Sequence, residues 1–303
     1  MVNKLRRLYT EKLWIKILTV TVIVLLSVAI MLPLIQIAEL FGINLRENVG
    51  LNFKVSFGNV FFFFLFGVCS IAIIWLAQKY IHKKPLAELG FRSKVGLPII
   101  AGFIVGAILV SIRYLVLIIN AESVTFTNVI PKNVFTIRYL GYYLYFLFGF
   151  IFWNSFIEEL GTRVYPIQKL KNHINPHIIF TIMGLIFTIG HFFLRDFNLG
   201  YFLSLFVFSY IFSLVYHYSS SIWLVVGIHS GINWVGFSFM GTSENWKLGA
   251  LYNTTISGVP SWIVNYSNVF IQLAFLLLIV FLNKKGVFKK LFPKTKEISN
   301  HLK

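Results

Sequence analysis

The stretch YYLYFLFGFIFW, residues 142–153, decides the fold class of this chain. Every position is aromatic, aliphatic or glycine, so a helix formed here has no polar face to turn toward water. Two neighbouring glutamates, Glu158 and Glu159, follow it in a chain with only ten acidic residues. An ionised carboxylate beside such a surface costs free energy unless it is paired or put to use. The segment therefore predicts a helix in lipid or in a packed bundle. It also predicts that the two neighbouring glutamates are either paired or functional.

The rest of the chain shares this apolar character. Of its 303 residues, 57% are apolar, 18% aromatic and 12% charged, and the mean hydropathy is +0.79. A helix that spans a bilayer needs about 20 predominantly apolar residues, and eight segments are long enough. We therefore predict an all-α, polytopic transmembrane helix bundle of about eight spans. The predicted spans lie near Ile17 to Phe41, Phe57 to Ala77, Leu97 to Ile119, Tyr139 to Thr162, His177 to Leu194, Leu199 to Tyr216, Ile222 to Met240 and Val264 to Leu282.

The connections between these spans are too short to hold a soluble domain, so residues 1–303 are predicted to form a single integral membrane domain. The first apolar run exceeds the roughly 7 to 15 residues of a signal-peptide core, and no A-x-A-like site ends it. It is therefore predicted to be a retained helix. The single cysteine, Cys69, lies inside the second span and excludes an intramolecular disulfide or a cysteine metal cluster.

The net charge of +17 follows the expected topology rather than forming one patch. The lysines and arginines are not interleaved with aromatic stacking platforms on a soluble face, so no nucleic-acid partner is predicted. By the positive-inside rule both termini are expected in the cytoplasm, which agrees with an even number of spans. The basic cytoplasmic tail, residues 284–303, is expected to rest on anionic lipid. The basic segments are the N-terminus and the parts of the chain near residues 79–94, 169–173 and 284–296.

Glu159 and Arg163 have the i,i+4 spacing that favours an ion pair on a helix. Glu158 is turned about 100° away on an ideal helix, has no partner nearby in the sequence and is expected to find one on another helix. A carboxyl group buried without a cation binds a proton more readily than one in water, which suits a general base. The alternative is a structural charge cluster at the membrane interface, with Arg163 reaching toward headgroups.

Two histidines and an asparagine lie within other apolar spans. His191 is near the end of the fifth span, and His229 and Asn233 are four residues apart on one face of the seventh. Histidine can hold a water, a metal ion or an oxyanion, and Asn233 adds a neutral hydrogen-bond donor. Hydrogen bonds to Thr188 or Ser230 are the structural alternative. The expected span directions place Glu158 and His191 at different depths, and a bundle that kept them apart would argue against a shared site.

Glycines in the spans that carry these groups favour close helix packing, because membrane helices approach each other through small residues. We expect the fourth, fifth and seventh spans to form the core of the bundle. The glycines are Gly161, Gly184, Gly190, Gly227, Gly231 and Gly236.

Three short motifs occur in order on these separate helices: EExxxR at residues 158–163, FxxxH at 187–191 and HxxxN at 229–233. Together they resemble the CPBP family, which comprises the type II CAAX prenyl proteases and the bacterial bacteriocin-processing or self-immunity (Abi) proteins. The resemblance covers roughly residues 85–240, the predicted catalytic core. It opens with LAELGF at residues 86–91, which is similar to a Leu-Gly segment of that family.

The resemblance implies an intramembrane peptidase in which Glu158 activates a water molecule. Glu159 and Arg163 would shape the site. Its substrate would be a hydrophobic or membrane-anchored peptide or protein. The remaining motif residues would bind a metal or stabilise the oxyanion: His191, His229 and Asn233.

The resemblance leaves two forms of catalysis open. A divalent metal such as Zn²⁺ would be held by Glu158, His191 and His229, a ligand set similar to that of zinc peptidases. If Glu158 were a ligand, another base would be needed, and the HExxH motif is absent. A glutamate-activated water without a tightly bound metal is the other form.

The biological setting is expected from composition, because the abundance of Lys, Ile, Phe and Asn is typical of AT-rich bacterial genomes. We expect a bacterial plasma-membrane protein acting in bacteriocin self-immunity or peptide maturation. A non-catalytic scaffold or regulator, or a proton-coupled transporter, is the alternative, although no internal repeat supports a transporter. Arg113, in the middle of the third span, is not explained by a peptidase and is expected to pair with an acid such as Glu39 or to bind a lipid headgroup.

Overall fold

The computed structural model describes residues 9, 11–43, 45, 57–91, 95–128, 137–192, 196–239 and 251–293. The predicted end of the fifth span at Leu194, that of the seventh at Met240 and the tail beyond residue 293 lie outside these residues. The elements are α2 (Leu13–Ala29), α3 (Met31–Leu40), α4 (Phe57–Leu76), η1 (Ala77–His82), η2 (Leu86–Glu88), α5 (Gly96–Ile119), β1 (Ser123–Asn128), α6 (Ile137–Leu144), η3 (Tyr145–Trp153), α7 (Asn154–Glu159), η4 (Leu160–Val164), α8 (Tyr165–Leu170), α9 (Pro176–His191), α10 (Leu199–Ser219), α11 (Ile222–Phe239), β2 (Tyr252–Ser257), α12 (Ser261–Lys284) and α13 (Val287–Leu291).

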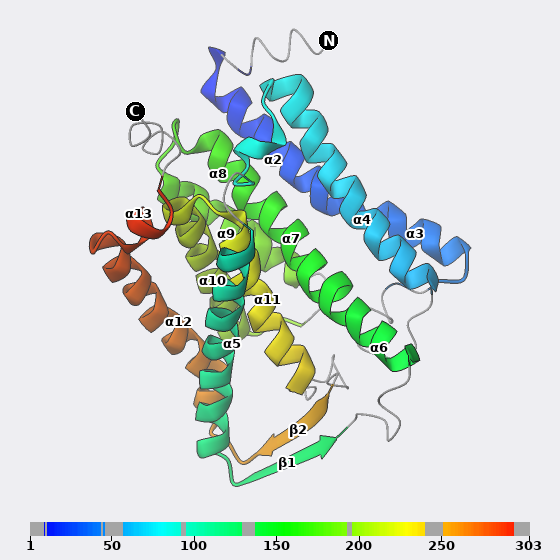
Figure 1. Ribbon diagram of the computed structural model, residues 1–303, viewed down its shortest axis with the longest axis vertical. Coiled ribbons are helices and arrows are strands. Elements are labelled where there is room, and N and C mark those ends of the chain that lie inside the picture. The colour runs from blue at the N-terminus through cyan, green and yellow to red at the C-terminus, as the bar shows by residue number, and fades with distance from the viewer. Residues whose placement is uncertain are drawn as a thin grey trace.

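Each of the eight predicted apolar segments contains a helix, so the all-α, polytopic bundle is confirmed (Figure 1). Within the described residues, 6 helices are long and apolar enough to cross a membrane, fewer than the eight spans predicted. The fifth segment forms α9, whose 16 residues are shorter than the bilayer requirement. The outer faces of the long helices carry exposed aliphatic side chains such as Ile104, Ile108 and Leu115 on α5, as a surface in contact with lipid would.

The fourth predicted span is a continuous helical stretch from α6 to α8, over residues 137–170, and it alternates between two helix types. The π-helical segments η3 and η4 flank α7, the short α-helix that contains both glutamates. Such segments add a residue to a helical turn and occur often at functional sites. Aromatic rings one turn apart stack within η3, including Phe146 with Phe150. The apolar run therefore forms a helix as predicted, but its turn geometry was not predicted.

The two ends of the bundle differ in character. The first residues of α2, together with η1, α8 and α13, lie in the upper half of Figure 1, whereas the two strands lie at the bottom. Side-chain contacts join the upper ends, because Lys16 Nζ is 2.8 Å from His173 Nε2 and His82 Nε2 is 2.8 Å from the Tyr165 hydroxyl. The predicted basic segments within the described residues therefore meet at one end. The side of the membrane that this end faces stays a prediction.

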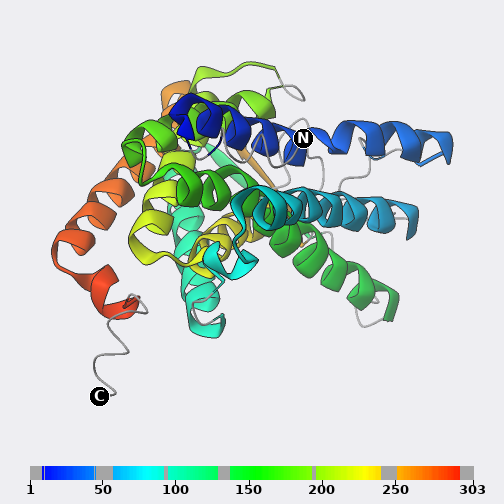
Figure 2. The same ribbon diagram turned by 90° about the horizontal axis from the view of Figure 1, so that it is seen from above.

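The opposite end carries an antiparallel two-stranded ribbon that was not predicted. β1 pairs with β2, with Ser123 opposite Ser257 and Asn128 opposite Tyr252. The backbone N–H of Leu251 donates to the Ser238 carbonyl at 2.8 Å, so the ribbon is attached to the last turn of α11. Seen from above, α3, α4 and α6 extend to the side away from α12 (Figure 2).

The closest helix contact in the bundle core joins α5 and α11 through glycines on both helices. A Cβ atom on Gly102 or Gly106 would collide with the backbone of α11, and one on Gly227 or Gly231 would collide with that of α5. Only hydrogen in place of a side chain permits this approach, as in other small-xxx-small contacts. The pairing fixes the position of α11, which carries His229.

The glycines were expected to bring the fourth, fifth and seventh predicted spans together, and the structure corrects this. Gly227 and Gly231 do pack closely, but against the third predicted span rather than the fourth or fifth. A Cβ on Gly184 would meet Phe206 of α10, and one on Gly161 would meet only the hydroxyl of Ser27 on α2. Among the described residues, nothing lies within 4 Å of a Cβ atom placed on Gly190.

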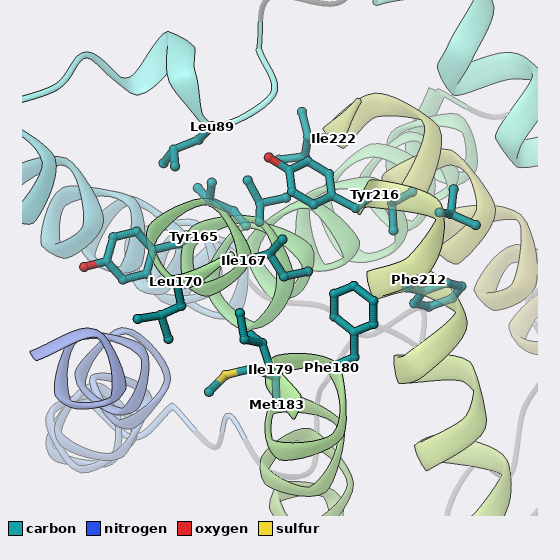
Figure 3. Packing of buried hydrophobic residues seen from close by; sticks show 14 of the residues in the cluster. Leu89, Tyr165, Ile167, Leu170, Ile179, Phe180, Met183, Phe212, Tyr216 and Ile222 are labelled. Atoms are coloured by element: carbon teal, nitrogen blue, oxygen red, sulfur yellow. The ribbon is translucent and has the colours of Figure 1, made fainter. Parts of the chain in front are cut away.

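The largest group of buried apolar side chains surrounds α8. Figure 3 shows Tyr165 and Ile167 of α8 packed with Phe180 of α9 and Tyr216 of α10. All four side chains are fully buried or nearly so. This packing holds the helical stretch that contains the glutamates rigidly between α9 and α10.

Candidate active site

Glu159 and Arg163 form a fully buried ion pair, as their spacing predicted. Arg163 Nη1 donates to Glu159 Oε1 at 2.9 Å, and neither side chain is exposed. Arg163 therefore does not reach toward headgroups, which removes that part of the structural alternative. Removal of one partner would leave an uncompensated buried charge. The pair is a fixed electrostatic element of the bundle interior.

Arg163 also connects α9 and α10 to the glutamate helix. Its Nη2 donates to the Ser209 hydroxyl on α10 at 3.1 Å, and its guanidinium carbon lies 3.8 Å from the centre of the Phe187 ring on α9. Its Nε has no hydrogen-bond partner within the described residues. A planar guanidinium is suited to this combination of fork-like donation and aromatic stacking.

His229 approaches the buried pair from α11. Its Nδ1 is 2.7 Å from Glu159 Oε1, and a carboxylate oxygen accepts, so Nδ1 carries the hydrogen. In this tautomer of the neutral ring, Nε2 is the nitrogen without hydrogen. The Phe212 ring stacks on the imidazole at 5.4 Å between ring centres. Glu159 therefore sets both the orientation and the tautomer of His229.

Glu158 lies next to this group but is held differently. Asn154 Nδ2 donates to its Oε1 at 2.7 Å, while its Oε2 is 3.8 Å from His229 Nε2. The side chain is 27% exposed, whereas that of Glu159 is not exposed at all. The prediction that Glu158 lacks a nearby partner in the sequence is wrong, because Asn154 lies one helical turn before it. The expected partner on another helix is present in His229.

Glu158 Oε2 and His229 Nε2 lie close together without a direct hydrogen bond between them. At 3.8 Å the two atoms are too far apart for a good direct hydrogen bond. A polar separation of this size is commonly bridged by a water molecule that bonds to both groups. One carboxylate oxygen is thus fixed by protein and the other is available for proton transfer.

His191 and Asn233 lie on α9 and α11, the helices that contribute Phe187 and His229 to this group. His191 Nδ1 donates to the Phe187 carbonyl at 2.9 Å, and the two rings are 4.5 Å apart. Since Phe187 also stacks on Arg163, α9 reaches the depth of the glutamate helix one turn before His191. Asn233 is half-buried one turn beyond His229 and makes no hydrogen bond with the described part of the chain. The catalytic roles of both residues stay predictions.

Sequence reasoning missed three residues of the site: Asn154, Ser209 and Phe212. Asn154 and Ser209 are polar residues in strongly apolar segments, and that contrast was the available signal. Phe212 is one of many phenylalanines in its helix and carried no such signal. Its role depends on tertiary packing against His229.

The predicted metal set is not assembled in the part of the chain that the structure describes. No group of three or more His, Cys, Asp or Glu side chains there has the spacing of a metal site. Nδ1 of both histidines faces a protein oxygen, so only Nε2 of His191 and of His229 is directed elsewhere. A divalent metal stays a prediction.

Arg113 does not pair with Glu39, so that prediction is wrong. Its guanidinium carbon lies 5.6 Å from the centre of the Tyr114 ring, and its Nε is buried without a partner among the described residues. Contact with a lipid headgroup stays a prediction.

Comparison with known proteins supports the resemblance found in the motifs. Residues 140–235 match the family model for type II CAAX prenyl endopeptidases, Rce1-like. The matched region includes α7, α9 and α11 up to residue 235, and it lies within the predicted core of residues 85–240. No curated protein and no solved structure matches the chain. The apolar helices indicate an integral membrane protein, and residues 140–235 are similar to a family of peptidases.

Proposed function

We propose that this chain is an intramembrane endopeptidase in which Glu158 activates a water molecule to hydrolyse a peptide bond. The match of residues 140–235 to type II CAAX prenyl endopeptidases supports a peptidase at the level of the family. The observation that carries the catalytic assignment is the division of the Glu158 carboxylate between Asn154 on one oxygen and His229 on the other.

In the proposed reaction, a water between Glu158 Oε2 and His229 Nε2 attacks the carbonyl carbon of the scissile bond. Glu158 takes a proton from this water as the carbon–oxygen bond forms, and later delivers it to the leaving amine nitrogen. His229 aligns the water through the unprotonated Nε2. Glu159 holds His229 in place, and Arg163 balances the charge of Glu159.

The oxyanion of the tetrahedral intermediate needs hydrogen-bond donors, and Asn233 is the best candidate. Its side-chain amide has two N–H groups, and it makes no hydrogen bond with the described residues. In their neutral forms, His191 donates its Nδ1–H to the Phe187 carbonyl and His229 donates its Nδ1–H to Glu159. The Nε2 atoms of both rings therefore accept hydrogen bonds and do not donate them. This assigns oxyanion stabilisation to Asn233.

The proposed substrate is a hydrophobic or membrane-anchored peptide or protein that reaches the site from the bilayer. We place the enzyme in a bacterial plasma membrane with both termini in the cytoplasm. Bacteriocin self-immunity and peptide maturation are the proposed settings. They rest on the predicted resemblance and on the composition of the chain.

A comparison of peptides from membranes tests this function. Small peptides and membrane-protein termini would be compared between cells expressing the wild type, Glu158→Gln and Glu88→Gln at matched levels. Glu88 is a matched control, because it is a half-buried carboxylate paired with Lys84 away from the site. We expect one or more products that occur with the wild type and Glu88→Gln but not with Glu158→Gln. Identical profiles for all three, with the biological phenotype retained, would instead support a non-catalytic scaffold.

A further inference from the structure

A second polar cluster, outside the site, lies where the ends of α2, η1 and α8 meet. Its most unusual member is Lys16, which is only 9% exposed although lysine is rarely buried. The Lys16 ammonium donates to His173 Nε2 at 2.8 Å and lies 5.3 Å from the centre of the Tyr9 ring. The side chain is thus turned into the bundle instead of outward to solvent.

Neighbouring groups continue the cluster across the end of the bundle. The Tyr9 ring is 4.9 Å from the His82 ring, and His82 Nε2 is 2.8 Å from the Tyr165 hydroxyl. Lys169 lies one helical turn beyond Tyr165 on α8. We call Lys16, His82, Lys169 and His173, with the hydroxyls of Tyr9 and Tyr165, the basic cluster. Its members come from separate segments of the chain, so the fold itself gathers them.

In the part of the chain that the structure describes, the two lysines of the basic cluster have no carboxylate in direct contact. Glu88 pairs with Lys84 at 3.1 Å and also acts electrostatically on Lys169. A buried ammonium without an opposite charge is costly, and neighbouring cations increase the cost. A site of this kind gains most from binding an anion.

His173 leaves Lys16 available to such an anion. Partial burial, and then the nearby Lys16 ammonium, lowers the pKa of His173. A neutral His173 accepts one hydrogen bond from Lys16 and leaves two ammonium hydrogens free. His173 is exposed and Lys16 is buried, so the cluster opens outward at the turn between α8 and α9.

We propose that the basic cluster binds a phosphate group, carried either by an anionic lipid headgroup or by a soluble phosphate. The cluster lies at the end of the bundle where the basic segments meet, and anionic headgroups gather at such ends of membrane proteins. Basic pockets between helices at this depth are typical sites for anionic headgroups. A bound phosphate would join α2 and η1 to α8, which continues into the helix that carries Glu158.

The test is lipid retention by the purified full-length chain, measured by native mass spectrometry with phosphatidylglycerol and phosphatidylcholine. Lys16→Met removes the buried ammonium, and His173→Ala alters the outer edge of the cluster while keeping Lys16. Lys290→Met is the control, because it removes the same charge from an exposed position on α13. A parallel measurement follows the thermal unfolding midpoint with added inorganic phosphate in detergent.

We expect the wild type and Lys290→Met to retain phosphatidylglycerol, and Lys16→Met and His173→Ala to bind it at least about tenfold more weakly, a difference of about 1.4 kcal/mol. If inorganic phosphate raises the unfolding midpoint of the wild type and displaces the lipid, the source is a soluble phosphate. If phosphatidylglycerol is retained and inorganic phosphate has no effect, the source is a lipid headgroup. Equal binding by all variants, or equal loss in Lys290→Met, would overturn the proposal. The result is independent of peptidase activity, because Glu158→Gln leaves the cluster intact.

Discussion

At the scale of single residues, the two neighbouring glutamates are distinguished by their partners. Glu159 is enclosed with a cation and a histidine, whereas Glu158 is partly exposed and bound to a neutral amide. A carboxylate that exchanges protons must not be locked in an ion pair, so this division assigns proton transfer to Glu158. Asn154 becomes a positioning residue, because it acts on the reaction only through Glu158.

The first prediction concerns Asn154. Asn154→Ala should lower kcat by about tenfold with little change in KM, a fraction of the 10²–10⁴ that a general base contributes. Asn154→Asp should move the rising limb of the pH–rate profile upward, because a second carboxylate disfavours the ionised form of Glu158. A purely structural role would reduce the amount of folded enzyme without moving the profile. An unchanged profile in Asn154→Asp would therefore remove the positioning role.

The second prediction separates structure from catalysis at the two glutamates. Glu159→Gln should lower the thermal unfolding midpoint strongly, since breaking a buried ion pair costs about 3–5 kcal/mol. Glu158→Gln should have less effect on the midpoint, because within the described residues Glu158 forms no ion pair with an arginine or a lysine. Both variants should be inactive. Equal midpoints for the two variants would contradict the different roles assigned to them.

At the scale of elements, the contact between α5 and α11 positions His229. Gly231→Ala would place a methyl group against the Phe103 carbonyl on α5. Overpacking of this kind costs about 1–3 kcal/mol, and a displaced α11 moves His229 away from Glu159. We expect a lower unfolding midpoint and reduced activity in Gly231→Ala. Gly190→Ala on α9, where no described residue lies within 4 Å of the added methyl group, should behave as the wild type in stability. Similar losses in both variants would argue against this contact.

The helices themselves could be predicted from the sequence, because long apolar runs separated by short polar segments leave little choice in a membrane. The Glu159–Arg163 pair followed from spacing, since both lie on one helix. The partner of α11 did not follow, because glycines recur in several spans and spacing does not say which helix they meet. The ribbon joins Ser123 to Ser257, residues far apart in the chain, and no local pattern marks such a pairing.

The π-helical segments are one reason why the hydrogen bond from Asn154 to Glu158 could not be predicted from the sequence. Asn154 begins the α-helical turns between η3 and η4, so its hydrogen bond to Glu158 depends on α-helical geometry there. The sequence indicates a helix through this region but does not indicate where a turn widens. The aromatic side chains that stack within η3 are typical of an ordinary apolar helix as well.

At the scale of the whole molecule, the basic end and the ribbon end should lie on opposite sides of the membrane. The positive-inside rule predicts that the basic end is cytoplasmic. In a Cys69→Ala background, Lys290→Cys on α13 and Phe126→Cys on β1 would report each end, because both positions are exposed. A membrane-impermeant thiol reagent should label Phe126→Cys in intact cells and Lys290→Cys only after permeabilisation. The reverse pattern would invert the proposed topology.

The central claim of the proposed function is hydrolysis by a water that Glu158 activates. The decisive measurement uses the purified chain in lipid nanodiscs and in ¹⁸O-enriched water. Its substrate is a peptide that is cleaved in membranes with the wild type but not in membranes with Glu158→Gln. We predict one ¹⁸O atom in the new carboxyl group, a rate about 10²–10⁴ lower for Glu158→Gln and an unchanged rate for Glu88→Gln. Cleavage by Glu158→Gln at the wild-type rate, or no cleavage by the wild type, would contradict the account.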